Sequence, residues 1–158
     1  MDKYSVFIKD KVLFGSYPSQ EDVYFLEKNG VTWFVNLTYN NERNIKPYTS
    51  NYNVLKFSIK DRNIPKDMIK WKTFLLKLKD IIDNLNDNEK MYIHCRGGHG
   101  RSCLTISCLA CLIYNIKPLE SIKQTTIMHN KRTTVKRDWP QPQSFKQMNF
   151  VEDLFNNK

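Results

Sequence analysis

The segment at residues 91–115 constrains the fold more than any other part of the chain. It opens with the short apolar run MYIHC, whose length is typical of a buried β-strand. Three of the chain's five glycines follow, at positions 97, 98 and 100. The next stretch, SCLTISCLACLIYN, is apolar on nearly every side, which predicts a central helix. A buried strand joined to a buried helix by a glycine-rich loop is typical of an α/β sheet covered by helices.

The rest of the chain repeats this alternation of strands and helices. β-Branched and aromatic residues predict the strands, and apolar residues at helical spacing predict the helices. The expected strands lie within 11–18, 31–38 and 53–59, and the expected helices within 19–30, 66–86, 118–130 and 143–155. The asparagine-rich segment 39–53 is expected to be a loop. We therefore predict one α/β domain over residues 1–158, with a central, mainly parallel sheet flanked by helices.

The charge balance indicates the class of partner. Lys and Arg number 25 against 16 Asp and Glu, so the net charge is +9. Such a surplus favours anionic partners, namely phosphorylated proteins, phosphoinositide headgroups or nucleic acid, although a basic solvated surface would explain it as well. No apolar run approaches the roughly 20 residues that a membrane-spanning helix needs. The N-terminus is interrupted by charges and does not resemble a signal peptide, so we expect a cytoplasmic protein and leave entry into the nucleus open.

All four cysteines fall within 17 residues, at positions 95, 103, 108 and 111. This layout does not suit a secreted disulfide framework. Cys108 and Cys111 have metal-ligand spacing, but no second ligand pair accompanies them and they lie in the apolar segment. We interpret both as buried helix residues and expect no metal.

The glycine-rich loop has the properties of a phosphate site. Glycines allow successive backbone N–H groups to turn inward around an anion, and the following helix N-terminus adds further donors. Cys95 begins this loop, where the same groups stabilise a thiolate, and Arg101 can hold two phosphate oxygens. The nucleotide-binding patterns G-x-x-x-x-G-K-[ST] and G-x-G-x-x-G are both absent. A thiolate in a phosphate cradle predicts phosphoryl transfer through a phosphocysteine.

The stretch HCRGGHGRS resembles the His-Cys-x5-Arg-Ser/Thr signature of the Cys-based protein tyrosine phosphatase superfamily. The short chain is similar to the dual-specificity branch of that superfamily. Within it, HCRGGHGRSCL and KQMNFV most resemble the cyclin-dependent-kinase-associated phosphatase and its relatives, and the likeness covers residues 12–155. The resemblance implies hydrolysis of phosphotyrosine and phosphoserine/threonine on protein partners, without a cofactor.

The resemblance also implies roles for single residues. Cys95 would be the nucleophile, and Asp61, in KDRNIP, would be the general acid, unless it is a solvated loop residue. Ser102 would hydrogen-bond the Cys95 sulfur, or serve as a helix N-cap. The substrate phosphate would be bound by the loop residues Arg96, Gly97, Gly98, His99, Gly100 and Arg101.

Four further residues receive supporting roles by resemblance. His94 would orient the loop, or be an ordinary core histidine, and Gln147 would position water, or lie on a helix surface. Arg132 and Arg137 belong to the basic run KRTTVKR, which in the family borders the cleft. We expect one of them to contact substrate, and a solvated loop is the alternative.

Other readings of the loop remain open at this stage. Arg96 and His99 occupy places where a group of phosphoinositide phosphatases carries lysines, so a phosphoinositide substrate is the main alternative. An RNA 5′-triphosphatase and a non-catalytic phosphoprotein-binding module are weaker ones, and we expect no specific nucleic-acid partner. Cys103 lies close to Cys95 in sequence, which suggests a protective disulfide under oxidation. The sequence does not determine the oligomeric state.

Overall fold

The computed structural model describes residues 3–135 and 140–156. Within these residues the chain forms one five-stranded sheet in the order β1-β2-β5-β3-β4. The strands are β1 (Ser5–Phe7), β2 (Val12–Gly15), β3 (Val31–Asn36), β4 (Asn53–Lys56) and β5 (Lys90–His94). Only the β1–β2 pair is antiparallel, and the other three pairs are parallel. The prediction of a mainly parallel α/β sheet is confirmed.

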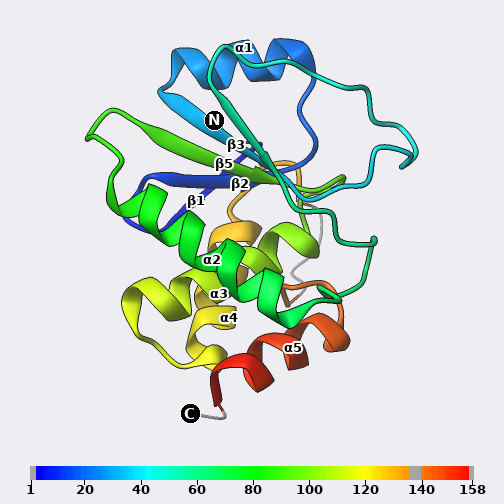
Figure 1. Ribbon diagram of the computed structural model, residues 1–158, viewed down its shortest axis with the longest axis vertical. Coiled ribbons are helices and arrows are strands. Elements are labelled where there is room, and N and C mark those ends of the chain that lie inside the picture. Colours follow the sequence, from blue (N-terminus) through cyan, green and yellow to red (C-terminus); the bar gives the residue numbers. More distant parts are fainter. Residues whose placement is uncertain (1–2, 136–139, 157–158) are drawn as a thin grey trace.

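Helices cover both faces of the sheet. The described helices are α1 (Gln20–Lys28), α2 (Met68–Asp83), α3 (Arg101–Tyr114), α4 (Pro118–Asn130) and α5 (Phe145–Asn156). In Figure 1, α1 lies over one face and α2 to α5 lie on the other. Helix α3 packs directly on the sheet and contacts β2 and β5, while α2, α4 and α5 pack around it. This central position explains the apolar character of α3, in which Cys108 and Cys111 are buried as expected.

The position of β5 determines where its following loop lies. Strand β5 is hydrogen-bonded on both sides, to β2 and β3, and the side chains of Met91, Tyr92 and Ile93 are fully buried. His94 is level with Gly15 of β2 and Asn36 of β3. The loop after His94 therefore emerges between two neighbouring strand ends, at the carboxyl edge where parallel α/β sheets bind ligands.

Strand β1 was missing from the sequence-based prediction. Its three residues are too few to show a hydrophobic period, and they become a strand only by pairing with β2. The turn between the two strands contains Ile8, Lys9 and Asp10 at φ values of 50°, 57° and 57°. Such left-handed geometry in non-glycine residues is uncommon.

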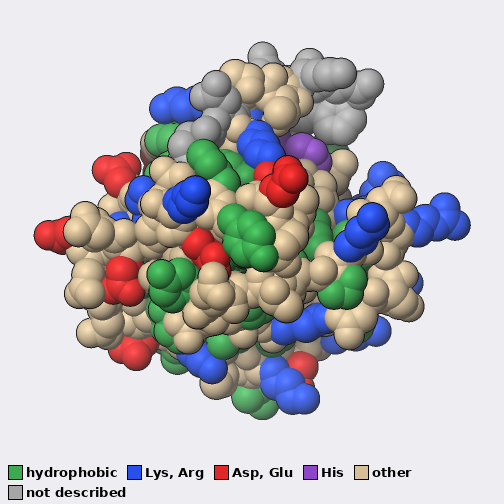
Figure 2. All heavy atoms as spheres, turned by 90° about the horizontal axis from the view of Figure 1, so that it is seen from above, with side chains coloured by type: hydrophobic (Ala, Val, Ile, Leu, Met, Phe, Trp, Pro, Cys, Tyr) green, Lys and Arg blue, Asp and Glu red, His purple; other side chains and the backbone are tan. Residues whose placement is uncertain are grey.

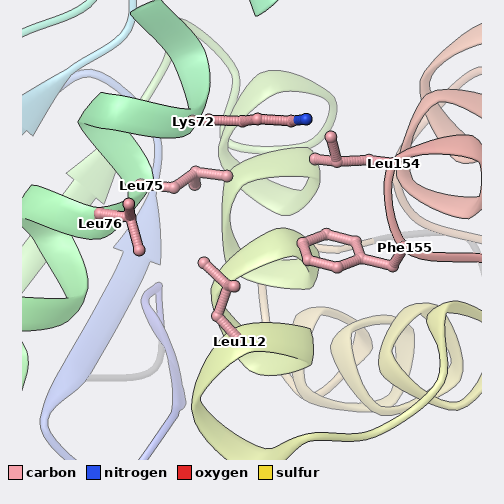
Figure 3. Close-up of a pocket in the computed structure, with 6 residues that line it drawn as sticks. All are labelled: Lys72, Leu75, Leu76, Leu112, Leu154 and Phe155. Carbon is pink, nitrogen blue, oxygen red and sulfur yellow. The ribbon is translucent and has the colours of Figure 1, made fainter. Parts of the chain in front are cut away.

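The layer of helices contains an apolar pocket of about 220 Å³. It lies between α2, α3 and α5 and is lined by Lys72, Leu75, Leu76, Leu112, Leu154 and Phe155 (Figure 3). The Lys72 side chain extends across the pocket toward Leu154. None of the lining residues belongs to the predicted site.

Among the described residues, none of the helices has the length and apolar character that a membrane span requires.

Candidate active site

The Cys95 sulfur lies in a closed turn of backbone between β5 and α3. The cysteine is buried, with 3% of its surface exposed. The Gly98 backbone N–H donates to Sγ at 3.3 Å, and the Ser102 Oγ lies 3.6 Å from Sγ. Helix α3 begins at Arg101 with Gly100 as its N-cap, so Ser102 lies inside the first turn and the N-cap interpretation is wrong. The sulfur therefore faces a backbone N–H and a hydroxyl group at the N-terminus of α3.

Gly98 allows the phosphate loop, residues 95–101, to approach the end of β2. Its φ is +77°, and a Cβ at this position would lie 2.4 Å from the Gly15 carbonyl carbon. Both the backbone angle and the close approach require glycine. A Cβ at Gly100 would lie 3.0 Å from the Gln147 amide, so α5 packs against the other side of the loop.

Arg101 is held by a carboxylate that the sequence analysis missed. Its side chain is 1% exposed, and its two terminal nitrogens donate to the two Glu42 carboxylate oxygens at 2.7 and 2.8 Å. One of them also donates to the Ile59 carbonyl at 2.8 Å. The Nε is buried and has no hydrogen-bond partner among the described residues, so it is available to an anion. Burial opposes ionisation of Glu42, but the Arg101 hydrogen bonds and the Tyr39 N–H lower the pKa of its carboxyl.

Asp61 lies over the same loop. Its Oδ2 pairs with Arg96 at 3.0 Å and its Oδ1 with Arg101 at 3.4 Å. The carboxylate remains 42% exposed. The structure thus brings Asp61 beside Arg96 and Arg101, although no local signal in the sequence specifies these contacts. Arg96, expected to bind substrate phosphate, is paired with Asp61 in this state.

Comparison with known proteins identifies the family. The model of the PTP-SAK family, described as "Swiss Army Knife protein, DSP-PTPase phosphatase domain", matches residues 2–149. The chain belongs to this family. "Putative tyrosine phosphatase 197R" of Invertebrate iridescent virus 6 is 43% identical over 150 residues, which are 94% of this chain and 52% of the viral protein. "Putative tyrosine phosphatase 067L" of Invertebrate iridescent virus 3 is 40% identical over 161 residues, with 98% and 66% covered. The chain thus spans about half to two thirds of the length of these relatives.

Solved structures share the fold of this PTP-SAK domain at low sequence identity. The active form of Tk-PTP superposes with a TM-score of 0.75 at 18% identity, covering 99% of this chain and 98% of that one. PTPMT1 in complex with PI(5)P superposes with a TM-score of 0.72 at 16% sequence identity, covering 98% of this chain and 96% of that one. Kinase associated phosphatase superposes with a TM-score of 0.66 at 21% sequence identity, covering 87% of this chain and 76% of that one. These structures establish the dual-specificity phosphatase fold, while the particular likeness to kinase associated phosphatase stays a prediction.

His94 of the PTP-SAK domain fixes the junction between β5 and the loop. Its Nδ1 lies 3.3 Å from the Cys95 carbonyl, which can only accept, so Nδ1 carries the proton. Its Nε2 therefore accepts from the Tyr48 hydroxyl at 2.7 Å. Burial lowers the pKa of His94 to about 3, against a smaller opposing effect of the Cys95 hydrogen bond. A neutral, fully hydrogen-bonded histidine suits a positioning role.

His99 is not the free cation that the phosphoinositide alternative requires. Its Nδ1 lies 2.7 Å from the Nε2 of His129, a buried residue of α4. Burial, with a contribution from nearby Arg132, lowers the pKa of His99. The same burial lowers the pKa of His129 to about 4. Both imidazoles are therefore neutral near pH 7, and one donates to the other.

The structure buries Arg132, one of the two arginines of which one was expected to contact substrate. The residue is 5% exposed and packs behind the phosphate loop. Protein acceptors surround its guanidinium there. It donates to the carbonyls of Gly98 and Phe14 at 2.8 and 3.1 Å and to the Ser5 hydroxyl. Its guanidinium carbon lies 5.1 Å from the centre of the Phe14 ring. Because Arg132 is buried, the alternative that it lies in a solvated loop is wrong. Arg137 lies outside the described residues.

Gln147 is buried rather than on a helix surface. Its amide donates to the Asn63 carbonyl at 3.1 Å, in the loop that carries Asp61. The same amide packs against Gly100. Gln147 therefore links α5, the Asp61 loop and the phosphate loop.

Cys95 and Cys103 are not joined by a disulfide. Cys103 lies behind the loop, with its sulfur 4.0 Å from the Gly98 carbonyl oxygen. Burial raises the pKa of this thiol to about 12. A protonated thiol attacks an oxidised cysteine slowly, so the burial of Cys103 disfavours the suggested disulfide between Cys95 and Cys103.

Proposed function

We propose that this PTP-SAK domain hydrolyses phosphate monoesters on proteins, at tyrosine and at serine or threonine, through a phosphocysteine. One observation carries the proposal. The Cys95 sulfur is held at a helix N-terminus, 3.3 Å from the Gly98 nitrogen, in the same loop as a buried arginine whose Nε has no partner among the described residues. This arrangement combines a nucleophile with donors for a phosphate.

In the first step the Cys95 thiolate attacks phosphorus and the sulfur–phosphorus bond forms. The bond from phosphorus to the leaving oxygen breaks, and Asp61 gives its proton to that oxygen. The loop amides and Arg101 stabilise the charge on the phosphoryl oxygens, with Glu42 holding the guanidinium in place.

In the second step water attacks the phosphocysteine and the sulfur–phosphorus bond breaks. Asp61, now ionised, takes a proton from the water, and inorganic phosphate and the Cys95 thiolate are released. Ser102 lies 3.6 Å from the sulfur, where its hydroxyl can donate to the departing thiolate. Gln147 contacts the Asp61 loop and suits a role in placing that water.

A protein substrate is supported by two observations. The two viral relatives carry names of tyrosine phosphatases, and they match this chain over 94% and 98% of its length. The pairing of His99 with His129 removes the second loop cation on which a phosphoinositide substrate would depend. Arg96 alone is a weak argument for a lipid, because it pairs with Asp61.

The test compares wild type, Cys95→Ser and Cys103→Ser on matched phosphopeptides, phosphoinositides and triphosphate-ended RNA. We expect Cys95→Ser to lower phosphopeptide hydrolysis by on the order of 10⁴-fold or more, since the nucleophile is removed. Cys103→Ser is the matched control and should keep most activity. Rapid quenching should trap a phosphoenzyme in the wild type and none in Cys95→Ser. Turnover of the lipid or the RNA in preference to every phosphopeptide would refute the proposal.

A further inference from the structure

We propose that a pocket beside the phosphate loop, together with a basic rim around it, binds acidic residues that flank the phosphorylated residue of a protein substrate. The inference rests on the proposed phosphatase function and specifies which substrates that site prefers. The pocket measures about 220 Å³ and is lined by Tyr17, Asn36, Asn40, Ile45, Pro47, Tyr48, Val54 and Lys56. Neither the motif nor the family match assigns a role to these residues.

Two hydrogen bonds join this pocket to the catalytic loop. The backbone N–H of Tyr17 donates to the Arg96 carbonyl at 3.0 Å. The Tyr48 hydroxyl donates to His94 at 2.7 Å, and His94 immediately precedes Cys95. The pocket wall and the phosphate loop are therefore in direct contact. A peptide whose phosphate is bound at Cys95 extends across this surface with its neighbouring residues.

Positive charge predominates in and around the pocket, although Glu27 of α1 accepts hydrogen bonds from Ser50 and Asn51 nearby. Between residues 36 and 60 the cations are Arg43, Lys46, Lys56 and Lys60, and all four are exposed. The one acid in this stretch is Glu42, whose two carboxylate oxygens both bind Arg101. Lys56, in the pocket, donates to the neutral amide of Asn40. The described residues offer no ion pair to these four cations.

The loop that carries Asp61 has the same character. Arg62 and Lys66 are exposed, while Asp61 itself turns toward Arg96 and Arg101. Figure 2 shows Lys and Arg side chains gathered on the side where these two loops lie in Figure 1, and most Asp and Glu side chains on the opposite side. The Glu42 and Asp61 carboxylates thus pair with Arg96 and Arg101, and the remaining outward charges of these loops are positive except for Asp67, the N-cap of α2. We call the exposed residues Arg43, Lys46, Lys56, Lys60, Arg62 and Lys66 the basic rim.

The shape and chemistry of the surface favour an acidic peptide. The rim cations are spread over two loops and the end of β4, which suits an extended chain with several carboxylates. The pocket combines apolar side chains with amide and phenol groups, and so suits a side chain rather than a bare phosphate. Exposed ion pairs are individually weak and are screened by salt, so the preference should come from several contacts together and fall at high ionic strength.

The experiment uses two phosphopeptides that differ only in their flanking residues, glutamate in one and glutamine in the other. Wild type is compared with the double variant Arg43→Glu/Lys46→Glu. The matched control is Lys28→Glu/Lys123→Glu, which makes the same charge change at exposed positions of α1 and α4. Hydrolysis of para-nitrophenyl phosphate reports the chemistry without flanking residues. Peptide Kd values in a Cys95→Ser background report recognition without turnover.

We expect wild type to prefer the glutamate peptide by about tenfold in kcat/KM at low salt, as electrostatic steering predicts. The preference should shrink at high salt and disappear in the rim variant, while the control variant keeps it. Equal Kd and kcat/KM values for both peptides in wild type, or an unchanged preference in the rim variant, overturn the inference. In a parallel assay with vesicles that contain multiply phosphorylated inositol lipids, a rim variant that loses vesicle binding but keeps its peptide preference overturns the inference in favour of a lipid site. Failure to hydrolyse any phosphate ester refutes the catalytic proposal. The ratio of the Kd values for the glutamate and glutamine peptides then still tests the acidic-peptide site.

Discussion

The phosphate loop and the two loops that face it, residues 38–52 and 57–67, differ in how the protein holds their charges. Behind and beneath the phosphate loop the polar groups are buried and paired: Arg101 with Glu42, Arg132 with backbone carbonyls, and His94 with Tyr48. In the facing loops most charged side chains are exposed, and only Glu42 and Asp61 turn inward.

The difference separates two tasks. A phosphate cradle must keep its donors within tenths of an ångström, which buried hydrogen bonds and close packing achieve. Substrate selection requires only a favourable field and accessible side chains, and exposed loops can change these without disturbing the cradle. Variants on each side should therefore fail in different ways.

Apart from loss of the nucleophile itself, the largest effect is expected at Arg101. In Arg101→Lys the ammonium cannot bind Glu42 and a phosphate in the same geometry, so the planar two-point contact is lost. We expect kcat/KM to fall by on the order of 10²–10³-fold with little change in the far-ultraviolet circular dichroism spectrum. Arg43→Lys, one residue from Glu42 but exposed, is the matched control and should retain wild-type kcat/KM on para-nitrophenyl phosphate. An Arg101→Lys variant as active as wild type would show that Arg101 does not hold the phosphate.

The next effect concerns Asp61 and depends on the leaving group. Asp61→Asn should lower kcat on a phosphoserine peptide by about 100-fold, because the alkoxide needs a proton as it leaves. The effect on para-nitrophenyl phosphate should be much smaller, since that phenolate leaves unaided. Asp80→Asn, an exposed change on α2, provides the control. Equal losses on both substrates would argue that Asp61 only positions Arg96 and Arg101.

A smaller effect, on stability rather than chemistry, is expected behind the loop. Arg132→Met keeps much of the side-chain volume but leaves the Gly98 and Phe14 carbonyls without their donor. The free energy of unfolding in urea should fall by about 2 kcal/mol. Lys131→Met changes an exposed neighbour and should leave the stability near the wild-type value. If Arg132→Met unfolds like the wild type and only loses activity, the residue contacts substrate after all.

The smallest effect is a slope of stability with pH. The folded-state pKa values of His94 and His129 are about 3 and about 4, below the usual 6.5 of an unfolded chain. Between pH 6.5 and 5 the unfolded state therefore binds more protons, and stability falls as the pH falls. Each histidine contributes a slope that rises toward a limit of about 1.4 kcal/mol per pH unit.

The measurement is the urea unfolding free energy of wild type and His129→Gln at pH 7, 6 and 5. The glutamine can still hydrogen-bond His99 but does not titrate, so its stability should fall less steeply. Lys131→Met is again the control, because it does not change a buried histidine and its stability should follow the wild-type pH dependence. Parallel slopes for wild type and His129→Gln would mean that His129 is not held neutral.

Local patterns in the sequence predicted most of the elements. Strand β5, helix α3 and the loop between them follow from one apolar run, three glycines and a second apolar run. The capping box of α1 and the Asp67 N-cap of α2 are also local, because a side chain meets a backbone amide three residues away. Strand β1 could not be predicted, since its three residues become a strand only beside β2.

The sequence alone therefore determined the α/β class and pointed to the proposed nucleophile Cys95 and the arginine that closes its loop, because these depend on neighbours within a few residues. The tertiary structure decided what surrounds them. Glu42 meets Arg101 from 59 positions away, and Arg132 reaches the Ser5 side chain from 127 positions away. Whether an arginine faces substrate or lies buried behind the loop depends on such distant acceptors. Burial therefore decides the role of a charged residue, and burial is a property of the whole fold.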